Sequence, residues 1–268
     1  MKAIAILAGA LVALSSAQSQ TGKTEVQWLS HASFRITSPG GKVIVIDPAL
    51  TVMPTTPPEY KKLEALGKVD LLLVTHGHWD HITDAPALAQ LNKIPLYAPG
   101  DLNNSLTTLG VLPAAQLPRF NKSGRITPLP GIKVTAVHAE HSSIYVWRNP
   151  ATSKDETHPG GEPIGYIIEL ENGFKIWHMG DTGVFGDMKW IAEYYKPDVV
   201  MIPIGGTFTM DAADAAYALR ELIKPKVAIP MHYRTTPDAK TPPQVLVETL
   251  GQTAIKVLQM KPGEKVEF

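Results

Sequence analysis

The chain has 268 residues, and its 25 lysines and arginines balance its 25 aspartates and glutamates. Because the net charge is zero, the charge does not favour nucleic acid or an anionic membrane as a partner. The sequence holds no cysteine, which excludes disulfides, thiolate metal ligands and a lipid-modified cysteine anchor. We therefore expect a small-molecule partner, and the composition leaves the oligomeric state open.

The chain begins with the pattern of a secretory signal peptide. Lys2 precedes an apolar run over residues 3–14, and small residues follow that run. A positive start, a short hydrophobic core and a small-residue cleavage site are typical of export signals, whereas a membrane span needs roughly 20 apolar residues. An uncleaved anchor or a buried first helix is the alternative. We expect residues 1–17 to be removed on export to the periplasm, and residues 18–268 to form one domain without a membrane anchor.

Beyond this segment, short apolar runs alternate with helical patterns. The expected strands, short and rich in branched side chains, are residues 42–46, 69–74, 132–137, 174–177, 199–204 and 227–231. The expected helices are residues 84–91, 187–195, 211–223 and 243–250. Several of the strands are followed directly by histidine or aspartate. This arrangement predicts an α/β layered domain with a site along one sheet edge.

The sequence HGHWDH at residues 76–81 directly follows an expected buried strand. His76 and His78 are two residues apart, so their imidazoles project to the same side of an extended chain, while Asp80 and His81 lie beyond a tight turn. One His/His pair and one Asp/His pair are the start of a two-metal site, and imidazole with carboxylate suits zinc, manganese or iron. A chance cluster of surface histidines is the alternative.

The remaining ligands are assigned by chemistry. The first metal needs another nitrogen besides the His/His pair, and His141 is the best candidate; His138 is the weaker one, because it can point into a sheet layer. The second metal, with the Asp/His pair, can take His232 from the end of the last expected strand. Two cations about 3.5–4 Å apart need a bridging anion. Asp181 in the sequence GDTG suits this role because its small neighbours let the backbone approach closely.

These motifs resemble the metallo-β-lactamase superfamily of two-metal hydrolases. The segments VQWLSHASFRI, VIDPAL, AEHSS, PIGGTFTMD and IPMHYRT are similar to its L-ascorbate-6-phosphate-lactonase-like branch, which includes the UPF0173 group. The resemblance implies a four-layer αββα sandwich with the metals at one edge between the two sheets. It implies a structural role for Asp47. The implied ligands are His76, His78 and His141 for the first metal, Asp80, His81 and His232 for the second, and Asp181 as the bridge.

The resemblance also implies metal-dependent hydrolysis with two divalent ions, zinc first and manganese or iron as alternatives. A metal-bridged hydroxide would attack a lactone or another cyclic ester. Asp80 or Asp181 would orient it, and an aspartate or His31 would pass a proton to the leaving group. A phosphodiester, a β-lactam and a non-catalytic metal-binding role are the alternatives, in that order. Lactamases lack the bridging aspartate and often use a cysteine ligand, so this chain departs from them.

Two loops are expected beside the site. Residues 143–163 are expected to be a long irregular loop, either a lid or a solvated excursion, in which Trp147 and Arg148 are candidates for contacting an apolar and an anionic substrate group. Residues 205–209 are expected to approach the substrate through their glycine backbone. His178 is either an orienting partner of a ligand or a buried structural histidine.

Overall fold

The computed structural model describes residues 22–235 and 241–268. The expected signal peptide, residues 1–17, therefore lies outside the described residues. Within the described ranges, no helix combines the length and apolar character needed to cross a membrane.

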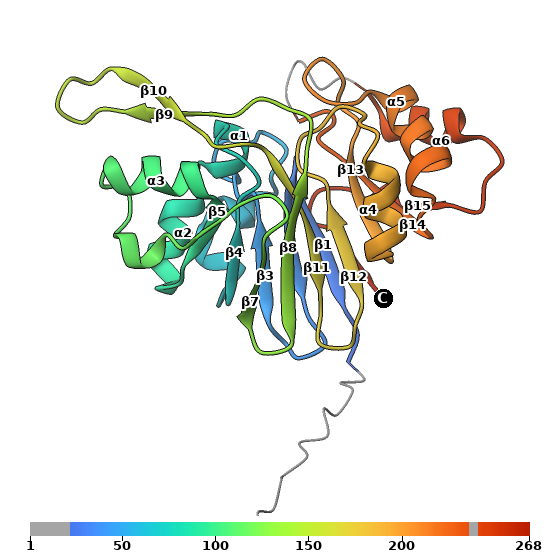
Figure 1. Ribbon diagram of the computed structural model, residues 1–268, viewed down its shortest axis with the longest axis horizontal. Helices are drawn as coiled ribbons and strands as arrows, with labels where there is room; N and C mark the ends of the chain where they lie inside the picture. Colours follow the sequence, from blue (N-terminus) through green and yellow to red (C-terminus); the bar gives the residue numbers. More distant parts are fainter. Residues whose placement is uncertain (1–21, 236–240) are drawn as a thin grey trace, which may run out of the picture.

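Two seven-stranded sheets form the centre of the molecule (Figure 1). In the first sheet the strand order is β16-β1-β2-β3-β4-β5-β6. Pairing is antiparallel from β16 to β3 and parallel from β3 to β6. The strands of this sheet are β1 (Glu25–Ser30), β2 (Ser33–Thr37), β3 (Val43–Ile46), β4 (Leu71–Leu73), β5 (Leu96–Pro99), β6 (Arg119–Phe120) and β16 (Lys265–Glu267).

The second sheet repeats this mixed construction, with the order β15-β14-β13-β12-β11-β8-β7. Pairing is antiparallel from β7 to β12 and parallel from β12 to β15. The strands of this sheet are β7 (Arg125–Leu129), β8 (Ile132–His138), β11 (Ile164–Glu169), β12 (Lys175–His178), β13 (Val199–Pro203), β14 (Val227–Met231) and β15 (Lys256–Val257).

Helices cover the outer face of each sheet (Figure 1). The side of the first sheet carries α1 (Trp79–Ile82), α2 (Ala85–Asn92) and α3 (Gly100–Thr108). The side of the second carries α4 (Met188–Tyr195), α5 (Ala212–Tyr217) with the π-helical η4 (Ala218–Ile223), and α6 (Pro243–Leu250). Short 3-10 turns are η1 (Pro58–Lys61), η2 (Leu63–Leu66) and η3 (Ala114–Gln116). The expected four-layer αββα sandwich is confirmed.

The core explains why the central strands are apolar throughout. In β3, Ile44 and Ile46 belong to the hydrophobic cluster that includes the second sheet, whereas Val43 and Val45 belong to the cluster that includes α2 and α3. Since successive side chains of a strand point to opposite faces, a strand between two layers must be apolar at every position. The continuous runs in the sequence are therefore the mark of central strands.

The expectation of an irregular loop over residues 143–163 is wrong. The segment forms a two-stranded antiparallel hairpin of β9 (Ile144–Arg148) and β10 (Asp155–Pro159), which we call the arm. Figure 1 shows the arm projecting from the body beyond α3. Its strands alternate exposed and half-buried residues. The backbone N–H of Asn149 closes the turn by donating to the Lys154 carbonyl oxygen at 2.9 Å. Alternating β-branched and aromatic residues favour a strand.

Candidate metal centre

The predicted ligands come together at one end of the sandwich, because they follow strands whose carboxyl ends meet at the same edge. They come from the segments after β4, β8, β12 and β14 and from the short helix α1. The residues are His76, His78, Asp80, His81, His141, Asp181 and His232. The arrangement fits the rule that sites of α/β sheets lie beyond the carboxyl ends of the strands.

Three imidazoles form the first group. His76 Nε2 lies 3.0 Å from His78 Nδ1, and His141 Nε2 lies 3.3 Å from the same nitrogen. Zinc bound to nitrogen at about 2.0–2.1 Å in tetrahedral geometry places its ligand atoms roughly 3.3–3.4 Å apart. The spacing therefore fits three nitrogens that share one ion.

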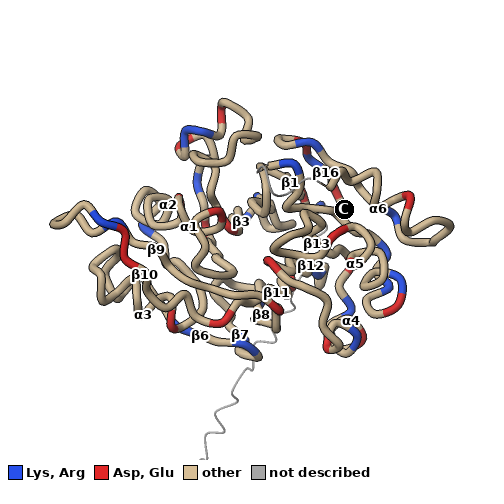
Figure 2. Tube along the Cα trace, turned by 90° about the horizontal axis from the view of Figure 1, so that it is seen from above, with Lys and Arg blue, Asp and Glu red and all other residues tan. Residues whose placement is uncertain are grey.

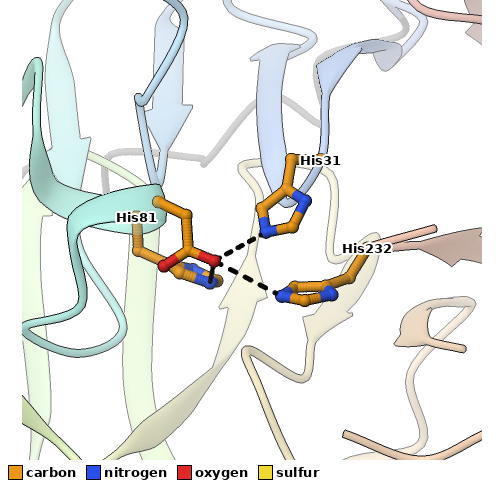
Figure 3. Close-up of side chains that lie close together, drawn as sticks. His31, His81 and His232 are labelled. Atoms are coloured by element: carbon orange, nitrogen blue, oxygen red, sulfur yellow. Dashed lines mark hydrogen bonds and ion pairs between the residues drawn. The ribbon is translucent and has the colours of Figure 1, made fainter. Parts of the chain in front are cut away.

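The second group surrounds one oxygen of Asp80, and Figure 3 shows how His31, His81 and His232 lie around it. Asp80 Oδ2 lies 3.7 Å from His232 Nε2 and 4.0 Å from His81 Nε2. His31 Nε2 is closer still, at 3.0 Å from the same oxygen. One ligand atom from each of these four residues lies within 4.8 Å of the others. The structure thus places His31 directly beside the second group.

Asp181 lies between the two groups. Its Oδ1 is 3.3 Å from His81 Nε2, and its Oδ2 is 3.1 Å from His232 Nε2 and 3.7 Å from His141 Nε2. Gly180, directly before it, has φ 64°, and a Cβ there would lie 2.8 Å from the Ile164 carbonyl oxygen. Glycine is therefore needed to bring the carboxylate this close to the sheet edge.

Several buried atoms that could bind a metal, on Asp181 and around it, lack hydrogen-bond partners. His81 Nε2, His232 Nε2 and Asp181 Oδ1 are all buried and form no hydrogen bond. Buried polar groups are almost always satisfied, so nitrogen and oxygen atoms without a hydrogen bond that converge on one region fit a site for a cation. All the donors are imidazole nitrogens or carboxylate oxygens, the set preferred by zinc, manganese and iron. The residues present fit a metal centre.

Asp47 and Thr75 set which nitrogen of two histidines faces the centre. Asp47 Oδ2 accepts hydrogen bonds from His81 Nδ1 at 2.8 Å and from Thr75 Oγ1 at 2.7 Å, and its Oδ1 accepts from the Thr75 N–H at 2.7 Å. Since the Thr75 hydroxyl donates to Asp47, its oxygen accepts from His76 Nδ1 at 3.0 Å. Both imidazoles then hold a proton on Nδ1, which leaves Nε2 as the nitrogen that faces the centre and can bind a metal, as in metal-binding histidines. The structural role expected for Asp47 agrees with these contacts.

The carboxylates make this region favourable for positive charge. Burial alone would lower the pKa of His81, but the carboxylates of Asp181, Asp47 and Asp80 outweigh it and raise the pKa well above its usual value. Burial likewise opposes protonation of His232, and Asp181 and Asp80 raise its pKa to about 9. For His76, burial and the neighbouring imidazoles lower the pKa well below its usual value. The field thus suits a cation held between Asp181 and the second group.

Backbone conformation also marks the site. His31, Asp47 and His232 have φ values of 51°, 46° and 58°, in the left-handed region that residues other than glycine rarely adopt. The N–H of His232 donates to the His31 carbonyl at 3.1 Å, and the two rings lie 3.7 Å apart between centroids. Residues held in such conformations cluster at functional sites.

Two further histidines lie outside the ligand groups. His138 is half-buried, with Nε2 3.2 Å from Glu140 Oε2. His178 is buried; its Nε2 donates to the Ala32 carbonyl at 2.9 Å, and its Nδ1 accepts from the Gly180 N–H at 3.2 Å. Both nitrogens of His178 are therefore used to hold the turn that carries Asp181, and burial lowers its pKa.

The arm does not bring the expected substrate contacts to the centre. Arg148 is exposed and pairs with Asp155 at 3.0 Å, and the Trp147 ring lies against His158, with centroids 6.1 Å apart. In the view from above, the arm extends away from α1 (Figure 2). Neither Trp147 nor Arg148 lines the cavity described next.

An open cavity of about 410 Å³ lies over the metal centre. Besides several of the ligands, its lining includes Trp79, Ser142 and Phe208. Sequence reasoning did not single out these three residues as part of the site. Trp79 stands inside the HGHWDH motif and Phe208 within the loop 205–209, so the position of each in its motif was an available signal.

Comparisons with known proteins agree with this geometry. The family model described as the β-lactamase superfamily domain matches residues 42–233. A UPF0173 metal-dependent hydrolase of a Polaromonas species is 63% identical over 265 residues, 99% of this chain and 97% of the relative. Another, from Roseiflexus castenholzii, is 40% identical and covers 91% of this chain and 97% of its own length. A solved metallo hydrolase of the archaeon Ignicoccus hospitalis is similar, with a TM-score of 0.76, 31% identity and coverage of 92% and 98%.

Proposed function

Because the chain belongs to the metallo-β-lactamase superfamily, and within it to the UPF0173 metal-dependent hydrolases, we propose that it binds two divalent metal ions, zinc first, and hydrolyses a lactone or another cyclic ester. The observation that carries the proposal is the position of Asp181 between two groups of nitrogen and oxygen donors. His76, His78 and His141 would hold one ion, and Asp80, His81 and His232 the other.

Metal ions bound at such a centre lower the pKa of water and polarise the carbonyl that is attacked. The protein's own residues have three tasks. Asp181 orients the reacting water from between the two groups. Asp80, which lines the cavity, passes a proton to the leaving oxygen. His31 is fully buried, and it acts through Asp80: Thr235 Oγ1 holds its Nδ1, and its Nε2 donates to Asp80 Oδ2.

The other reactions receive less support. Arg148, the candidate contact for an anionic group such as a phosphodiester, is paired with Asp155 on the arm. A β-lactam also fits less well, because this chain has the candidate bridging residue Asp181, which lactamases lack, and has no cysteine to serve as a ligand. The size of the cavity suits a small-molecule substrate. Export of the mature chain to the periplasm remains part of the proposal.

The test is proton release by the metal-loaded protein, followed in a pH-stat with a lactone, a phosphodiester and a β-lactam. We expect metal-dependent release from the lactone, abolished by a chelator. Asp181→Asn should reduce the rate by at least roughly a hundredfold, because the site loses a charge that orients the reacting water. The matched control is Asp187→Asn, an exposed carboxylate at the start of α4. Full activity in a folded, metal-loaded Asp181→Asn protein would contradict the role of Asp181.

A further inference from the structure

Two exposed aromatic side chains stand at the cavity over the metal centre. Trp79 is 54% exposed and Phe208 is 62% exposed, and both line this cavity together with the ligands. They come from distant segments, the first residue of α1 and the loop after β13. A single exposed aromatic residue is ordinary. Two exposed aromatic side chains that line the same cavity as a group of polar residues are typical of a binding site.

Both aromatic residues are held in place by their backbones. Trp79 stands between the ligands His78 and Asp80, and its carbonyl accepts the Thr83 N–H at 3.3 Å. Phe208 donates its N–H to the Gly206 carbonyl at 2.7 Å, within a turn closed by Gly206 and Met210. A backbone that is already held in this way loses little further conformational freedom when a ligand binds.

Beyond the metal ligands, the described part of the cavity lining offers no charged partner for an anionic substituent. Among the residues that the structure describes, no lysine or arginine lines it. Arg148 lies on the arm, and Arg234, two residues after the ligand His232, lines a separate pocket with Trp28. Phosphate groups are usually held by arginine, lysine or a helix N-terminus. Apart from the metal ligands, the described lining consists of Trp79, Ser142 and Phe208, none of which carries a charge.

We infer, on the basis of the proposed hydrolase function, that the substrate is an uncharged lactone or ester with an apolar chain or ring that packs on Trp79 and Phe208. In the reaction the acyl C–O bond breaks, the oxygen of water joins the acyl carbon, and a proton goes to the leaving oxygen. A lactone then gives a single hydroxy acid. We therefore expect a phosphorylated sugar lactone to be a poorer substrate than a lactone with an apolar substituent.

The experiment compares kcat/KM of the metal-loaded protein for lactones whose alkyl substituent grows from methyl to octyl, with a phosphorylated sugar lactone beside them. We expect kcat/KM to rise roughly threefold for each methylene that becomes buried. Trp79→Ala and Phe208→Ala should each lower it by about tenfold or more for the octyl lactone, and by much less for the methyl lactone. The control is Trp190→Ala, a similarly exposed aromatic residue on α4, which should leave the whole series unchanged.

A binding measurement separates this inference from the proposed function. Alkyl hydroxamates bind metal centres without turnover, so calorimetry can follow their affinity as the chain lengthens. Affinity that does not depend on chain length, or a preference for the phosphorylated lactone, would overturn the inference, while hydrolysis of any lactone would still support the function. Affinity that rises with chain length and falls in Trp79→Ala, without hydrolysis of any lactone or ester, would overturn the proposed reaction and support apolar recognition.

Discussion

At the scale of single residues, the side chains that hydrogen-bond to the metal ligands have roles as specific as those of the ligands themselves. Asp47→Asn keeps the shape of the side chain but leaves one acceptor oxygen where two now serve Thr75 and His81. His81 then loses the partner that fixes its proton on Nδ1. Since changes to such partners of ligands cost about 10–100-fold in metal affinity, we expect a loss of that size, measured by competition with a chelator.

Asp84→Asn is the matched control for this change. Asp84 is also a buried carboxylate, and it accepts hydrogen bonds from Thr51 N and Thr51 Oγ1. Among the described residues Asp84 forms no hydrogen bond or ion pair with a ligand, so its replacement should lower thermal stability without weakening metal binding. Equal metal affinity in folded Asp47→Asn and wild-type protein would show that the Asp47 contact does not orient His81.

Residue types and spacing are enough to predict which side chains come together, because several histidines and aspartates directly after buried strands are typical of a metal site and are rarely needed for the fold. Their outer partners follow only from the folded chain. His81 meets Asp47 across 34 positions, and His31 meets Thr235 across 204. Neither pairing leaves a local pattern in the sequence. The assignment of individual ligands to two metals stays a prediction.

At the scale of elements, the base of the arm holds the metal-binding loop in place. Ser143 Oγ accepts the Gly77 N–H at 3.0 Å, and a Cβ on Gly77 would lie 2.8 Å from the Ile144 carbonyl oxygen and 3.0 Å from Gly160 Cα. Gly77→Ala must therefore push the loop away from the arm. We expect the free energy of unfolding to fall by about 1–3 kcal/mol, as for other overpacked sites, and metal bound per chain to decrease, measured by denaturant titration and elemental analysis.

Gly186→Ala controls for the loss of a glycine, since no atom lies within 4 Å of a Cβ at that position. It should change the free energy of unfolding by no more than about 0.5 kcal/mol and should leave the metal bound per chain unchanged. If Gly77→Ala behaves like Gly186→Ala, the arm does not constrain the loop that carries His76 and His78.

The elements that could be predicted are those buried on both faces or clearly capped. The expected strand at 227–231 is β14, and the helix expected at 211–223 has Asp211 as its N-cap, accepting from the Ala213 and Asp214 N–H groups. The change to π-helix at Ala218 leaves no comparable signal. The arm was missed although β9 is rich in β-branched and aromatic residues, because its partner β10 is polar and resembles a loop in composition. The start of α3 was missed because it follows Pro99 directly, at a Pro-Gly pair that predicts a turn.

At the scale of the whole molecule, the sandwich and the metal centre depend on different interactions. Two hydrophobic clusters hold the layers together, whereas the ligands lie beyond the strand ends. The protein should therefore stay folded when its metals are removed, but less stably, because ligands that bind only the native state add about 2.7 kcal/mol at a hundredfold excess over Kd.

For a domain of this size, that difference corresponds to a fall in Tm of about 5–10 °C. Thermal unfolding followed by circular dichroism, before and after dialysis against a chelator, measures it. Asp181→Asn should show a smaller difference, because it has already lost the carboxylate between the two groups. An unchanged Tm in protein shown to be metal-free would mean that the metals contribute nothing to stability. Loss of the folded spectrum at room temperature would mean that the two clusters cannot hold the sandwich without them.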